Sequence, residues 1–174
     1  MELRFVAPDL HRLDDTPAEV IACGVWSDER PMRGLAGLLD WRLAGRVSKL
    51  LRESFTKGEV GDVLCVQGRP RLPYEKVLFV GVGERASFDE ERFRTALARL
   101  LGTLSGLHVK RAVVELPGRA GDRIAPERDA ELALEAARDS EDHDAWWLVE
   151  PPEAQAKIAS RTNDERRRGL GASA

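Results

Sequence analysis

Apolar residues along this chain follow two alternating patterns: short continuous runs, and segments in which they recur every three or four positions. The runs predict β-strands at residues 2–6, 20–26, 63–66, 76–82, 111–116 and 145–149. Nearly every residue of Val20–Trp26 is apolar, which is typical of a strand buried on both faces. Amphipathic helices are expected between the strands. The whole pattern therefore predicts an α/β sandwich around a largely buried sheet.

Three helices are expected from the spacing of the apolar residues. The first runs over Leu35–Leu51 and has a single apolar face. The second begins at Ser87, because Ser87 and Glu90 have the spacing of a capping box. The third covers Pro126–Arg138, where early acidic residues suit the positive end of the helix dipole.

The character of the sequence changes after Pro151 and Pro152. Residues 1–150 contain all the predicted strands and form one candidate domain. Residues 151–174 are polar, charged and small, which predicts a short helix followed by a frayed tail. The total of 174 residues fits one domain of this kind.

Composition narrows the class of protein. Hydrophobic residues make up 43% and charged residues 33%, and no apolar run approaches the length of a membrane span, so no membrane contact is expected. The net charge of −3 disfavours nucleic acid as a partner. Cys23 and Cys65 lie in apolar runs, which predicts buried thiols, and the N-terminus lacks the pattern of a secretory signal. These features indicate a cytoplasmic protein.

One segment matches a nucleotide-binding motif in form. Gly81, Gly83 and Ala86 give the spacing G-x-G-x-x-A after a strand. Glu84 would face the phosphates with like charge, and the expected acidic residue about 20 positions further on is absent. A tight turn is the preferred interpretation, and a nucleotide or ADP-ribose site at Gly81, Gly83 and Glu84 is the alternative.

No pattern predicts catalysis, a cofactor or a metal site. His143 stands among acidic residues at 141–144, which favours a solvated loop over a metal centre. The cysteines have no C-x-x-C partner, and no serine lies in a G-x-S-x-G elbow. We therefore expect no enzyme activity, no catalytic residue and no metal.

Two features suggest contact with a partner. Trp146 and Trp147 are adjacent in a predicted strand, so their rings point to opposite faces. Either both faces are covered by the protein, or one ring anchors a partner. The second feature is the basic run Arg166, Arg167 and Arg168, which is either a solvated helix surface or a contact to phosphates.

The order of motifs from Val20 to Gly118 resembles the N-terminal domain of the leucyl aminopeptidase (M17 metallopeptidase) family. The matching segments are Val20–Trp26, the turn Phe55–Asp62, the strand and turn Lys76–Gly83, and Ala112–Pro117. The resemblance implies a macro-like three-layer α/β/α sandwich with a mixed, mostly parallel central sheet. In that family the zinc ions and the catalytic residues belong to a separate C-terminal domain, whose signature N-T-D-A-E-G-R-L does not occur here.

The resemblance implies a stand-alone, non-catalytic domain that acts through protein–protein contact, with itself or with a partner protein. In the family the corresponding domain contributes to hexamer assembly, and in some bacterial members to DNA binding. Two alternatives stay open: a nucleotide or ADP-ribose binding module at the Gly81–Gly83 turn, and a DNA-associated regulator.

Overall fold

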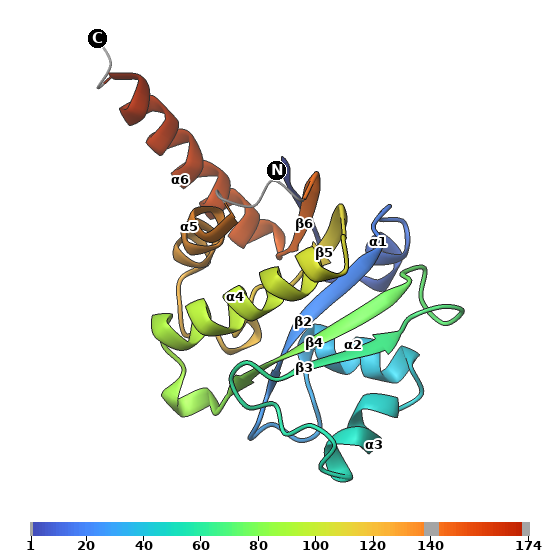
Figure 1. The fold of residues 1–174 in the computed structure, drawn as a ribbon. Helices are drawn as coiled ribbons and strands as arrows, with labels where there is room; N and C mark the ends of the chain where they lie inside the picture. The colour runs from blue at the N-terminus through green and yellow to red at the C-terminus, as the bar shows by residue number, and fades with distance from the viewer. Residues whose placement is uncertain (1, 138–142, 172–174) are drawn as a thin grey trace.

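A six-stranded sheet with the strand order β1-β6-β5-β2-β4-β3 forms the centre of the molecule (Figure 1). The computed structural model describes the backbone of residues 2–137 and 143–171, and side chains up to residue 161 within those ranges. The strands are β1 (Glu2–Val6), β2 (Val20–Trp26), β3 (Val63–Gln67), β4 (Lys76–Gly83), β5 (Arg111–Val114) and β6 (Ala145–Val149). All neighbouring strands are parallel except β3, which runs antiparallel to β4 at one edge.

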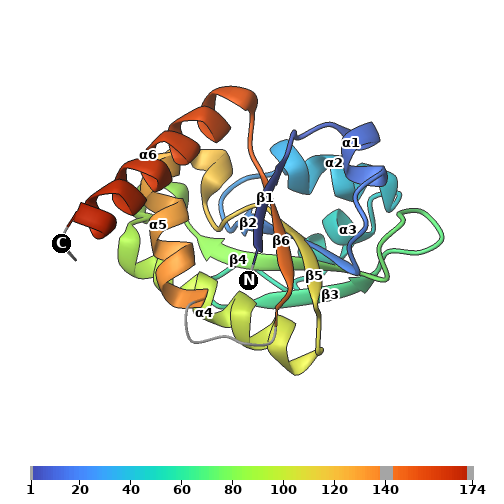
Figure 2. The same cartoon turned by 90° about the horizontal axis from the view of Figure 1, so that it is seen from above.

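Helices cover both faces of this sheet and complete a three-layer α/β/α sandwich (Figure 2). One layer contains α1 (Leu10–Asp14), α2 (Gly34–Arg42) and α3 (Arg46–Arg52). The other contains α4 (Glu90–Gly106), α5 (Pro126–Ala137) and the start of α6 (Pro152–Gly171). Two short 3-10 turns, η1 (Arg85–Ser87) and η2 (Arg119–Gly121), follow β4 and β5. The predicted fold class is confirmed.

The position of each strand explains its hydrophobic pattern. Strand β2 lies between β4 and β5 and is buried on both faces, as its continuous apolar run predicts. Strand β3 is at the edge, and its residues alternate between buried and exposed. Cys65 in β3 is therefore exposed, whereas Cys23 in β2 is buried. The prediction that both thiols are buried is wrong for Cys65.

The single helix predicted over Leu35–Leu51 is wrong, because the structure divides it into α2 and α3. Ala44 and Gly45 have positive φ angles of 58° and 73°, and the helix cannot continue through them. The Asp40 carboxylate accepts hydrogen bonds from the backbone N–H groups of Val47 (2.8 Å) and Ser48 (3.2 Å). It thereby satisfies donors at the start of α3.

Three other boundaries differ from the sequence predictions. Asp89, and not Ser87, caps α4, because its side chain accepts the backbone N–H of Arg92 at 3.0 Å. Ser87 belongs to η1, so the helix begins later than the capping-box spacing suggests. Strand β5 ends at Val114, and α6 extends over 20 residues where a short helix was expected.

Candidate functional site

Charged residues gather where the parallel strands end. Glu115 directly follows β5 and Glu150 directly follows β6, while Arg85 opens the 3-10 turn after β4. Ligands of open α/β sheets bind outside the carboxyl ends of the strands, where the connecting loops leave a crevice. A ligand-binding site is therefore expected at this edge of the sheet.

The structure has a hollow of about 450 Å³ at this edge, which we call the strand-end pocket. The chain segments around it come from the ends of β1, β5 and β6, from η2, and from the start of α2. Its lining combines apolar and charged side chains: Pro8, Arg33, Gly34, Leu35, Leu38, Arg85, Glu115, Arg119, Ala120, Asp122, Val149, Glu150 and Pro151. The volume is in the range of small-molecule sites.

A buried ion pair forms one wall of the strand-end pocket. The Arg119 guanidinium donates to both carboxylate oxygens of Glu150 at 2.8 and 3.0 Å, and the two side chains are 10% and 1% exposed. Arg119 also pairs with Asp122 at 2.7 Å. Burial raises the pKa of Glu150, while the charge and hydrogen bonds of Arg119 oppose that rise. The charges of this wall are thus compensated within the protein.

Two further carboxyl groups near this wall favour their protonated forms. Burial raises the pKa of Glu115 to about 8, and the charge of Glu150 adds to the shift. The backbone N–H of Leu35 donates to the Glu115 side chain and opposes the shift. Burial likewise raises the pKa of Asp129 to about 8. At neutral pH these two groups add little negative charge to the pocket edge.

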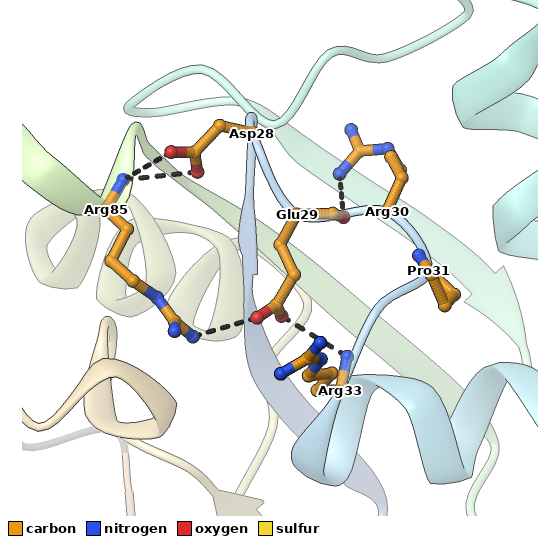
Figure 3. Close-up of a pocket in the computed structure, with 6 residues that line it drawn as sticks. All are labelled: Asp28, Glu29, Arg30, Pro31, Arg33 and Arg85. Carbon is orange, nitrogen blue, oxygen red and sulfur yellow. Dashed lines mark hydrogen bonds and ion pairs between the residues drawn. The ribbon is translucent and has the colours of Figure 1, made fainter.

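A second hollow of about 250 Å³, the loop pocket, adjoins the strand-end pocket through Arg33 and Arg85 (Figure 3). The Arg85 guanidinium pairs with Glu29 at 2.8 Å and lies 5.5 Å from the centre of the Trp26 ring. The backbone N–H of Arg33 donates to the other oxygen of Glu29 at 3.2 Å. Glu29 therefore ties the loop after β2 to both arginines.

Arg33 differs from the other arginines of the two pockets. Arg85 pairs with Glu29, Arg119 pairs with Glu150, and Arg30 donates to three backbone carbonyls. Within the described part of the chain, the exposed Arg33 guanidinium has neither an ion pair nor a hydrogen bond. It is the positive group that these pockets offer to an anionic ligand.

Gly81 and Gly83, at the end of β4, do not offer their backbone N–H groups to a ligand. The N–H of Gly81 donates to the carbonyl of Asp62 at 2.8 Å, and the N–H of Gly83 donates to the carbonyl of Gly58 at 2.9 Å. A Cβ atom at Gly81 would lie 2.0 Å from the Glu59 carbonyl oxygen, so the 58–62 loop presses directly on the strand. Residues 81–83 are thus the end of β4, and the tight turn preferred from the sequence lies after them, at η1. Glu84 is exposed beside it.

The tryptophan pair of β6 is inside the protein. Trp146 is fully buried and Trp147 is 8% exposed, since helices cover both faces of the sheet. The Arg4 side chain also lies over the Trp147 ring at 5.1 Å. Of the two possibilities left by the sequence, the structure has both faces covered, and the expectation of an exposed anchor at Trp146 or Trp147 is wrong. The side chains of Arg166, Arg167 and Arg168 lie outside the described residues.

A different tryptophan is exposed. Trp41 in α2 is 71% exposed and borders a groove of about 510 Å³, the Trp41 groove. The groove is lined by Pro31, Met32, Gly37, Asp40, Trp41, Ala44, Gly45 and Ser48. Trp26, Trp146 and Trp147 are each at most 8% exposed, so Trp41 accounts for nearly all the exposed tryptophan surface.

No candidate metal centre is found among the side chains that the structure describes. In residues 2–137 and 143–161, no group of three His, Cys, Asp or Glu side chains is placed to hold an ion. His143 is buried rather than solvated, and its Nδ1 lies 2.7 Å from the carbonyl oxygen of Val109. The acidic neighbours Glu141 and Asp142 lie outside the described residues. Over the described chain, no helix has both the length and the apolar character that crossing a bilayer requires.

Comparison with known proteins places this fold in a family. Residues 20–145 match the model of the cytosol aminopeptidase family, N-terminal domain. The chain belongs to this family. A probable cytosol aminopeptidase of Pseudomonas fluorescens is 36% identical over 92 residues, which cover 53% of this chain and 18% of that enzyme. The chain thus matches only about a fifth of the length of this curated relative.

Solved structures agree with the family at the level of the fold. A tomato leucine aminopeptidase variant superposes with a TM-score of 0.66 at 12% identity, over 93% of this chain and 35% of that one. A Trypanosoma brucei macrodomain in complex with ADP-ribose gives a TM-score of 0.68 at 17% identity, over 90% and 66% of the two chains. This member of the aminopeptidase N-terminal-domain family therefore has a macrodomain-like fold.

Sequence reasoning about this family member missed the residues of both pockets. A usable signal existed, because Glu115 and Glu150 are charged residues that directly follow buried strands. Asp28 and Glu29 follow β2 in the same way. Arg33 and Arg119 carry no such signal. Only the folded chain brings the start of α2 and the turn after β5 to one pocket.

Proposed function

We propose that this chain is a non-catalytic accessory domain of the cytosol aminopeptidase family that acts through protein–protein contact at the Trp41 groove. The observation that carries the proposal is the exposure of Trp41 beside a groove with apolar lining. Exposed tryptophan rings are frequent anchors at protein interfaces because one ring removes a large apolar area from water on binding. The relatives are named as cytosol enzymes, and the proposal extends the same compartment to this chain.

The local packing supports a role in contact and not in folding for this ring. Leu35 and Leu39 of the same helix are 1% exposed and fill the core, while Trp41 points away from it. Trp41 therefore contributes little to the buried core. Packing of the core does not explain why this large apolar ring is exposed to water.

Photochemical cross-linking in cells tests the proposal. A photo-reactive amino acid is placed at position 41, and in a control protein at position 99, an exposed position of α4 in the opposite helix layer. We expect an adduct with a protein at position 41 and none at position 99. Absence of an adduct at position 41, or equal adducts at both positions, contradicts the proposal. Hydrolysis of leucine p-nitroanilide by the purified chain with Zn²⁺ or Mn²⁺ contradicts the proposal that the chain is non-catalytic.

The strand-end pocket favours a second candidate function, binding of a nucleotide or ADP-ribose. The observation is the unpaired guanidinium of Arg33 at a pocket of about 450 Å³ outside the strand ends. This candidate site is not the one predicted from the sequence at Gly81–Gly83. The backbone N–H groups of Gly81 and Gly83 already donate to carbonyl groups of the protein. Calorimetric titration with ADP-ribose tests it. Micromolar one-to-one binding that Arg33→Glu removes supports the candidate, and a flat trace contradicts it.

A further inference from the structure

The charge of this chain is distributed unevenly. The segment 33–57, which contains α2 and α3, holds six of the 27 basic residues and two of the 30 acidic residues. This segment therefore carries a charge of +4, and the rest of the chain carries −7. Figure 1 shows α2 and α3 on one side of the sheet, away from α4, α5 and α6. The segment 33–57, which carries Trp41, is thus a positive part of a negative protein.

Several of these basic side chains have no ion pair among the described residues. Arg42 pairs with Asp14 at 3.0 Å, and Lys49 lies 3.8 Å from Glu53. By contrast, the exposed side chains of Arg46, Arg52 and Lys57 have no ion pair within the described part of the chain. Unpaired cations in a cluster attract anionic partners and raise the rate of encounter.

The polar side chain in the floor of the Trp41 groove is hydrogen-bonded within the protein. Asp40 is the one ionisable residue in the lining, and it is buried. Its carboxylate accepts two backbone N–H groups of α3 and the Ser48 hydroxyl at 2.5 Å, so its oxygens already have donors. The remaining lining is apolar or small, with Pro31, Met32 and Ala44 beside the Trp41 ring. Such a floor accommodates an uncharged apolar side chain.

From these observations, and resting on the proposed function, we propose that the Trp41 groove binds a short acidic peptide segment of a partner protein that carries an apolar anchor residue. Arg46 directly follows the lining residue Gly45. Arg52 is one helical turn beyond the lining residue Ser48 in α3. The acidic residues of the segment face these two cations, and the apolar residue packs beside Trp41. A nucleic-acid strand is the other kind of polyanion that basic side chains attract. Surfaces for single strands combine several stacking rings along a basic track, whereas this groove places one ring beside an apolar floor.

Binding of a synthetic peptide to the whole chain tests the inference. The probe has about twelve residues of Asp and Glu with two central leucines, a length that spans a groove of this kind. One control peptide replaces the leucines by serine, and another replaces the acidic residues by lysine. Wild-type protein is compared with Trp41→Ala and Arg52→Glu. The matched control is Arg99→Glu, which makes the same charge change on exposed α4.

We expect saturable binding with a dissociation constant of about 10–100 μM, measured by fluorescence anisotropy at low salt. Trp41→Ala and Arg52→Glu each weaken it about tenfold or more, and Arg99→Glu leaves it unchanged. Both control peptides bind at least about tenfold more weakly than the probe.

The inference is overturned by no binding of the probe, by equal binding to all variants, or by tighter binding of single-stranded DNA of the same charge. If the position-41 cross-link forms but the probe does not bind, the acidic-segment inference fails and the proposed function stands. If neither the cross-link nor probe binding is found, both fail. If sedimentation of the chain alone shows a dimer that Trp41→Ala dissociates, the occupant of the groove is a second copy, and the inference fails as well.

Discussion

The strand-end pocket and the Trp41 groove differ in how the protein uses their charges. In the pocket, Arg119 is held by Glu150 and Asp122, and the buried Glu115 favours its neutral form. In α3, which contributes Ser48 to the groove, Arg46 and Arg52 have no ion pair within the described residues, and the Trp41 ring of α2 faces solvent. The pocket wall thus pairs its charges inside the protein, whereas the helices beside the groove leave charged and aromatic side chains exposed to solvent.

Removal of the buried cation of the pocket has the largest expected effect. Arg119→Met leaves Glu150 buried without its partner, and such a change costs about 3–5 kcal/mol of unfolding free energy. The double variant Arg119→Met with Glu150→Gln restores part of this loss, because no unpaired charge remains. Urea denaturation measures both. A loss below about 1 kcal/mol for the single variant contradicts the structural role of the pair.

Dependence of stability on pH tests the buried carboxyl groups of the same region. The folded pKa of Glu115 is about 8, above its ordinary value of 4.5, so the folded chain retains a proton that the unfolded chain loses. Stability from this group is complete below about pH 4.5 and falls as the pH rises toward 8, by about 1.4 kcal/mol per pH unit.

Glu115→Gln is expected to remove the contribution of Glu115 and to raise stability at pH 8, while Asp129 keeps a slope of the same sign. Urea denaturation between pH 5 and pH 8 measures the change. Equal slopes for the variant and the wild-type protein show that Glu115 is ionised in the folded chain.

Truncation of tryptophan separates the groove from the core. Trp41→Ala is expected to change the free energy of unfolding by less than about 0.5 kcal/mol, because the side chain is 71% exposed. Trp147→Ala removes a ring that is 8% exposed and costs about 3–5 kcal/mol. Comparable losses of unfolding free energy for the two variants would show that Trp41 is packed like a core residue. The Trp41 groove would then not differ from the core in this respect.

Quenching of fluorescence reports the charge around Trp41 and gives the smallest expected effect. Iodide is attracted to a positive surface and caesium is repelled, so at low salt iodide quenches Trp41 roughly twofold more efficiently. Arg52→Glu lowers this ratio, and high salt removes it. Trp41→Ala gives the background from the three buried tryptophans. Equal quenching by the two ions in the wild-type protein contradicts a positive surface around Trp41.

The sequence by itself determines the order of the strands along the chain and the buried character of the central ones. A run such as Val20–Trp26 has no polar residue that tolerates solvent exposure on either face, so its environment is specified locally. The family follows from the same region, because its turns recur in fixed order around those strands.

Only the tertiary structure decides which side chains remain available. The sequence shows the same residue type at Trp41 as at the two adjacent tryptophans of β6. Strand β6, however, lies between β1 and β5 with helices covering both faces, so its tryptophans are buried. Trp41 lies in a helix, one face of which turns away from the sheet. The glycines at 81 and 83 match a phosphate-binding motif, yet the loop at 58–62, distant in sequence, takes up their N–H groups. Exposure and pairing depend on contacts between distant segments, and no local pattern records them.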